Sequence, residues 1–122
     1  MNTEQHLDKA RAILAGLAKL DSATEALAII DGTMIAGFHL GNGALHAHGV
    51  TKPSIHYNTP SKFEVRPESL PAAVKPVYDV FAELEGMRSH YVRNPNPPDA
   101  QAATRAQLLL ARMAALCGVA TK

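Results

Sequence analysis

Apolar residues recur at the spacing of an α-helix in four segments of this 122-residue chain. Hydrophobic residues make up 47% of the sequence, but only 5% of the residues are aromatic and tryptophan is absent. Such a composition favours closely packed helices over a sheet. The sequence therefore predicts an all-α fold, an antiparallel four-helix bundle in one domain covering residues 1–122. The four expected helices cover residues 3–20, 22–49, 71–94 and 99–118.

Capping and proline signals predict where these helices begin. The run from Ser22 to Glu25 has the form of a capping box, so the second helix should start at Ser22. Pro71 fits the first turn of the third helix, whereas Pro76 predicts a kink or a later start. Asp99 is expected to cap the fourth helix.

Four glycines stand in the second helical segment, and each costs a helix about 1 kcal/mol relative to alanine. Gly37 and Gly41 lie one turn apart on one face, which predicts a close approach of the backbone to another helix. A break near Asp31 and Gly32 is the alternative. The connection over residues 50–67 contains three prolines among apolar residues, so we expect it to pack on the bundle, with a short hairpin as an alternative.

Charge and cysteine content exclude several classes of protein. A net charge of +1 argues against a strongly electrostatic nucleic-acid binder, although a local basic patch remains compatible with it. The single cysteine, Cys117, cannot form an intrachain disulfide and is expected to be a buried, inert thiol. The sequence has no apolar run near the ~20 residues of a membrane span and no signal-peptide pattern at its start, so we expect a cytoplasmic protein without membrane contact.

Six histidines raise the question of a metal site. His39 and His46 are seven residues apart and can share a helix face. Zinc needs three or four converging ligands with supporting carboxylates, and the second helix offers only Glu25 and Asp31 near its start. The sequence therefore predicts no metal and no cofactor, with His39 and His46 as the first candidates should an ion be found.

Polar groups are crowded at the end of the third helix, where Arg88, His90, Arg93 and Asn94 precede a proline-rich break. Cations near a helix C-terminus are favoured by about 0.3–1 kcal/mol, which explains these residues structurally. Paired arginines also offer forked donors to an anion. We therefore consider Arg88, His90, Arg93 and Asn94 a candidate anion or phosphate site.

The order of the elements is similar to that of the HEPN family of helical domains. The stretch GFHLGNGALHAHGV at residues 37–50 is similar in texture to the second helix of that family. Residues 88–93 resemble the Arg-x4–6-His ribonuclease motif, with Arg88 at the motif arginine. Arg93 stands where the catalytic histidine would be expected, and an arginine cannot exchange a proton near neutral pH.

The resemblance implies a degenerate HEPN-like member that binds without catalysis, associated with a nucleotide or RNA. It also implies a homodimer and a possible nucleotidyltransferase partner. Two alternatives remain open. One is a ribonuclease in which His90 or another histidine replaces the missing one, and the other is a purely structural oligomeric bundle.

Overall fold

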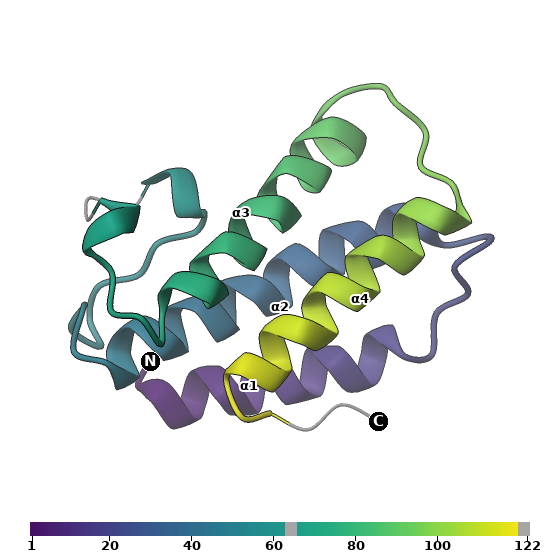
Figure 1. Cartoon of the computed structure of the whole chain (residues 1–122). Coiled ribbons are helices and arrows are strands. Elements are labelled where there is room, and N and C mark those ends of the chain that lie inside the picture. The colour runs from purple at the N-terminus through teal and green to yellow at the C-terminus, as the bar shows by residue number, and fades with distance from the viewer. Residues whose placement is uncertain (63–65, 120–122) are drawn as a thin grey trace.

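The computed structural model describes residues 1–62 and 66–119, and every regular element in that part is helical (Figure 1). The predicted all-α class is confirmed for these residues. Three short elements join the helices: the 3₁₀ turns η1 and η2 in the connection, and a π-helical turn, η3, that continues α3. The bounds are α1 Thr3–Leu17, α2 Ala26–Ala47, η1 Pro60–Lys62, η2 Pro67–Ser69, α3 Lys75–Arg88, η3 Ser89–Arg93 and α4 Ala100–Leu116.

Helix α2 contacts each of the other three α-helices, and Figure 1 shows it running through the middle of the molecule. One apolar core draws side chains from all four α-helices. Phe81 is fully buried at its centre, beside Leu40 of α2 and Met113 of α4. Because α2 is apolar around most of its surface, it can serve as this shared partner.

Two glycines of α2, Gly37 and Gly41, face side chains of α3, whereas Gly32 and Gly43 face α1. A Cβ atom on Gly41 would lie 2.9 Å from Cδ2 of Phe81, and one on Gly37 would lie 3.2 Å from Cδ1 of Leu84. The expected close approach is therefore made by side chains of α3 against the α2 backbone. Helix α2 continues without interruption through Asp31 and Gly32, so the alternative of a break there is wrong.

Two predicted helix starts differ from the structure. Helix α2 begins at Ala26, because Asp21 and not Ser22 organises the preceding turn. Asp21 Oδ1 accepts a hydrogen bond from the Ala23 amide at 2.7 Å, and the Asp21 amide donates to Glu25 Oε1 at 3.0 Å. Helix α3 starts at Lys75 and not near Pro71. Pro76 lies in its first turn, so the structure has the later start that Pro76 predicts.

The start of α4 agrees with the sequence. The side chain of Asp99 caps this helix by accepting a hydrogen bond from the Ala102 amide at 2.9 Å, as predicted.

The connection between α2 and α3 is anchored at two points. Asn42 is fully buried, and its side chain accepts a hydrogen bond from the Tyr57 amide and donates one to the Tyr57 carbonyl, each at 2.9 Å. Farther along, Glu85 accepts hydrogen bonds from the Ser61 amide at 3.1 Å and from the Ser61 hydroxyl at 2.6 Å. The described residues of the connection form no strand, and the expected packing holds for Val50, Tyr57 and Pro60, whereas Ile55 is exposed. Phe63 and Val65, which were also expected to pack, fall outside the described residues.

The sequence also predicts that the chain has no membrane span and that Cys117 is a buried, inert thiol. In the part that the structure describes, no helix is long and apolar enough to cross a membrane. Cys117 is partly buried, and burial raises the pKa of its thiol to about 11, which suits the inert thiol predicted from the sequence.

Candidate functional site

The predicted anion segment contributes two of its four residues to one open pocket of 340 Å³. Arg88 is the last residue of α3 and Arg93 is the last of η3. We call this cavity the basic pocket, because Lys62 of the connection joins the two arginines around it. Its other lining residues come from α2 and the connection: Met34, Ile35, Phe38, Asn58 and Thr59.

The charges of the basic pocket are only partly compensated within the described residues. Arg88 Nε donates to Asp31 Oδ1 at 2.8 Å, and the two side chains are 30% and 41% exposed. Lys62 and Arg93 are exposed. Three cations and one carboxylate therefore stand at or beside a pocket whose α2 wall is apolar.

The other two predicted residues, His90 and Asn94, take part in hydrogen bonds to backbone carbonyls of η3. Asn94 Nδ2 donates to the Ser89 carbonyl at 2.8 Å, which ties the end of η3 to its beginning. His90 is exposed, and its carbonyl accepts a hydrogen bond from Asn96 Nδ2 at 3.0 Å. Neither side chain lines the basic pocket. The sequence reasoning missed Lys62, because a residue in a connection has no fixed spacing to a helix end.

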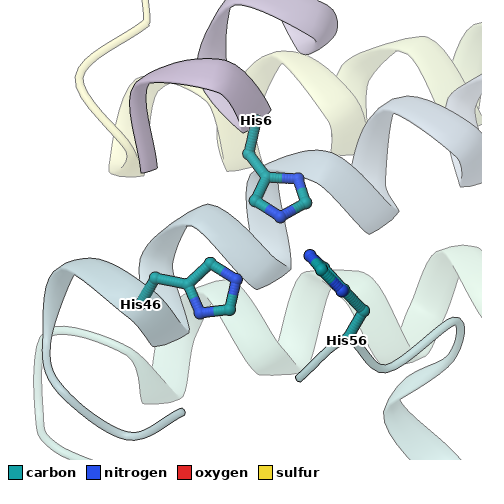
Figure 2. A group of neighbouring side chains, drawn as sticks. All are labelled: His6, His46 and His56. Atoms are coloured by element: carbon teal, nitrogen blue, oxygen red, sulfur yellow. The ribbon is translucent and has the colours of Figure 1, made fainter. Parts of the chain in front are cut away.

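A second group of polar side chains lies toward the C-terminal end of α2, next to Phe38 of the basic pocket. His6 of α1, His46 of α2 and His56 of the connection turn their rings toward one shared space (Figure 2). One ring nitrogen from each lies within 4.8 Å of those of the other two. We call these three residues the histidine cluster. His6 is fully buried, His46 is partly buried and His56 is exposed, so the cluster reaches from the core to the surface.

The outer ring nitrogens of two members already have partners. His6 Nδ1 lies 3.0 Å from His39 Nδ1, and His46 Nδ1 lies 2.8 Å from the Thr51 hydroxyl and 3.3 Å from the Thr51 carbonyl. The Nε2 atoms of both His6 and His46 are buried and have no hydrogen-bond partner among the described residues. Buried nitrogens without a partner cost about 1–3 kcal/mol each, so this arrangement needs an explanation.

The environment keeps His6, His39 and His46 neutral at pH 7. The pKa of His6 is lowered to about 4, chiefly by burial and then by the nearby His39, His46 and His56. Burial also lowers the pKa of His39, with Lys9 as the next cause. The pKa of His46 is lowered by burial as well, and its hydrogen bond with the backbone of Thr51 opposes that effect. Neutral imidazoles carry a free electron pair on one ring nitrogen.

His39 and His46 lie on the same side of α2, as their spacing allows, because both rings lie beside that of His6, with centroids 5.3 and 5.2 Å away. The group of three converging nitrogens, however, is formed by His46 with His6 and His56. His6 and His56 come from two other elements, and a spacing rule within one helix cannot find them.

The comparisons with known proteins leave the site as the only guide to function. No family model, no curated protein and no solved structure matches this chain.

Proposed function

We propose that this chain is a non-catalytic binding module that takes a phosphate-bearing ligand, a nucleotide or a segment of RNA, in the basic pocket. We further propose that its four helices form an antiparallel, HEPN-like bundle. One observation carries the functional proposal: Lys62, Arg88 and Arg93, from three different elements, line one pocket.

The lining of the basic pocket suits both halves of a nucleotide. Guanidinium groups offer two parallel N–H donors to a phosphate, and the ion pair with Asp31 holds Arg88 in place while part of it remains exposed. Phe38, with Met34 and Ile35, provides an apolar wall on which a base can pack. Phosphate contacts with a ring nearby are the combination that single-stranded nucleic acids and nucleotides require.

We propose a module without catalytic activity because no histidine stands among the described residues that line the basic pocket. A general acid or base must exchange a proton near neutral pH, which arginine cannot do and lysine seldom does. The rival function, a ribonuclease using His90, requires that exposed residue to act from outside the basic pocket. As the HEPN-like resemblance implies, we also propose a homodimer with the basic pockets near each other and a nucleotidyltransferase as partner.

Ligand titration tests this function. ATP, inorganic phosphate and a short single-stranded RNA are titrated into the full chain by calorimetry at low salt. Arg93→Ala should weaken ATP binding about tenfold, because a lost charge-assisted hydrogen bond costs about 1.5–3 kcal/mol and exposure reduces that value. Arg11→Ala is the matched control, since Arg11 is also exposed but pairs with Asp8 on α1.

Three outcomes would contradict the proposal. If none of the three ligands binds at millimolar concentration, the proposed function is wrong. Equal losses in Arg93→Ala and Arg11→Ala would show binding to surface charge in general. RNA cleavage that His90→Ala abolishes would establish the ribonuclease instead. Sedimentation of the same samples reports whether the chain is a dimer.

A further inference from the structure

We propose that the histidine cluster is a binding site for one divalent transition metal ion, with zinc as the best fit, ligated by His6, His46 and His56. This site is separate from the basic pocket and shares no lining residue with it. The proposal goes beyond phosphate binding and stands whether or not that function is correct.

The first argument is the pair of buried nitrogens without partners. His6 is fully buried, and its Nε2 atom has no hydrogen-bond partner among the described residues, as is also true of His46 Nε2. Nearly all buried side-chain polar atoms in folded proteins have a partner. Two exceptions on adjacent rings indicate a missing partner that both share. A metal ion accepts both electron pairs at once.

The second argument is the arrangement of the outer nitrogens. A histidine that ligates a metal usually donates its other N–H to a fixed acceptor, which sets the tautomer and the ring orientation. The Thr51 carbonyl and hydroxyl lie beside His46 Nδ1, so a proton on Nδ1 leaves Nε2 free. His39 Nδ1 does the same for His6, since it can accept from His6 Nδ1 at 3.0 Å. Both orphaned Nε2 atoms are thus presented with their electron pairs available.

The third argument is distance. Tetrahedral zinc with bonds of about 2.0–2.1 Å holds its ligand nitrogens about 3.4 Å apart. The three ligand atoms here lie within 4.8 Å of one another, so they need to move together by about 1.4 Å at most. His56 is exposed and lies in the connection, and its Nε2 atom lies 3.4 Å from the N-terminal amine of Met1. Once this surface contact is exchanged for the ion, the His56 side chain can make most of that movement without disturbing the core.

The ligand set also selects the kind of ion. Imidazole suits zinc, copper, nickel and cobalt, whereas magnesium and calcium require oxygen ligands. Three histidine ligands leave one tetrahedral position for water, as in open zinc sites. These ligands come from α1, α2 and the connection, so the ion joins three elements that lie far apart in the sequence.

The prediction of no metal depended on the shortage of carboxylates in the second helix. It concerned only ligands and carboxylates on a single helix. Neutral imidazoles need no carboxylate as a ligand, and here a carbonyl, a hydroxyl and another imidazole take the supporting role. The structure therefore weighs against that prediction, and direct measurement can settle it.

The test uses the full chain, freed of any affinity tag and treated with chelator. Calorimetric titration with Zn²⁺ should give one ion per chain. His56→Ala should weaken binding by about 100-fold or more, because even outer-shell changes cost 10–100-fold. His48→Ala is the matched control: this exposed histidine caps the same end of α2 but lies outside the histidine cluster. Replacing Zn²⁺ by Co²⁺ should give the intense visible absorption of a tetrahedral ion.

The results separate the proposal from its rivals. Weak binding of several ions, or equal losses in His48→Ala and His56→Ala, would show adventitious binding to surface histidines and overturn the proposal. Because His56 is exposed, its variant should remain folded, and a melting curve without metal checks this. Saturating Zn²⁺ should raise the melting temperature of the native chain, because an ion that binds only the folded state stabilises it by about 2.7 kcal/mol at 100 times its Kd.

His39 provides an independent check as a positioning residue. His39→Leu removes the acceptor beside His6 Nδ1, so Zn²⁺ affinity should fall about 10–100-fold while the stoichiometry stays at one. In His39→Asn the side-chain oxygen can stand near the place of Nδ1, and affinity should largely recover. If His39→Leu binds Zn²⁺ as tightly as the unaltered chain, His6 is not held in the proposed way and is not a ligand.

Discussion

The basic pocket and the histidine cluster are neighbours along α2 but manage polar groups in opposite ways. Phe38 lines the pocket, and its ring centroid lies 5.9 Å from that of His6 and 6.3 Å from that of His56. In the basic pocket the cations are exposed or partly exposed, and one of them is paired with Asp31. In the histidine cluster burial lowers the pKa of His6 and His46, and the Nε2 atoms of these two residues are buried without partners among the described residues. Water stabilises the unpaired charges of the basic pocket, whereas the buried Nε2 atoms of the histidine cluster have no hydrogen-bond partner among the described residues.

This difference indicates how each region should respond to a ligand. An anion at the basic pocket replaces water around groups that are already well solvated, so the net gain is modest. An ion in the histidine cluster satisfies atoms that cost free energy in its absence. We therefore expect weak, salt-dependent binding in the basic pocket and tight, stoichiometric binding in the histidine cluster.

The largest expected effect comes from the anchor that the two regions share. Asn42 holds Tyr57, which stands between His56 of the cluster and Asn58 of the pocket. Asn42→Ala removes three hydrogen bonds, two to Tyr57 and one to the Phe38 carbonyl. The free energy of unfolding, measured in urea, should fall by about 3 kcal/mol.

The same variant should also weaken both Zn²⁺ and ATP binding, because it releases the connection from α2. Asn58→Ala is the control for Zn²⁺ binding, since Asn58 is exposed, adjoins Tyr57 in the sequence and is not part of the histidine cluster. If Asn42→Ala leaves both affinities unchanged, the two regions do not depend on the anchored connection.

The second effect is a dependence of stability on pH that originates in the histidine cluster. His6 has a folded-state pKa of about 4 against 6.5 in the unfolded chain. Between these values the unfolded chain binds more protons, so the free energy of unfolding is highest above pH 6.5 and falls as the pH drops toward 4. The full shift corresponds to about 2 kcal/mol by pH 5, and after a discount for solvent screening we expect a loss on the order of 1 kcal/mol in metal-free protein.

Urea unfolding at pH 7.5 and pH 5, both with chelator, measures this loss. His6→Leu should reduce the pH dependence, because the buried group that titrates is gone. His48→Leu should retain it, since His48 is exposed. An equal loss in the His6→Leu and His48→Leu variants would assign the effect to other groups.

The sequence predicts one of these regions better than the other for a physical reason. Helical periodicity and the Asp99 cap are local, and the all-α class and the start of α4 follow from them. The arginines stand close together in sequence, so a basic helix end is visible without a structure. The histidine cluster joins positions 6, 46 and 56, and Lys62 reaches the basic pocket from the connection. Tertiary packing alone brings these residues together, and no local spacing encodes it.

The smallest effect concerns the compensating charge beside the basic pocket. Asp31→Asn removes a carboxylate that pairs with Arg88, and an exposed pair of this kind contributes about 0–1 kcal/mol to stability. Stability should therefore change little. ATP affinity should rise about fivefold at low salt, because a negative charge near the ligand is worth about 1 kcal/mol at 4 Å in water.

Salt then distinguishes this charge effect from a change of shape. The Debye length falls from about 30 Å at 0.01 M salt to about 8 Å at 0.15 M, so the gain in Asp31→Asn should shrink as salt is added. Zn²⁺ binding by the same variant should stay unchanged, because Asp31 is not part of the histidine cluster. If ATP affinity falls in Asp31→Asn, the carboxylate acts by holding Arg88 in place, and orientation rather than charge limits binding in the basic pocket.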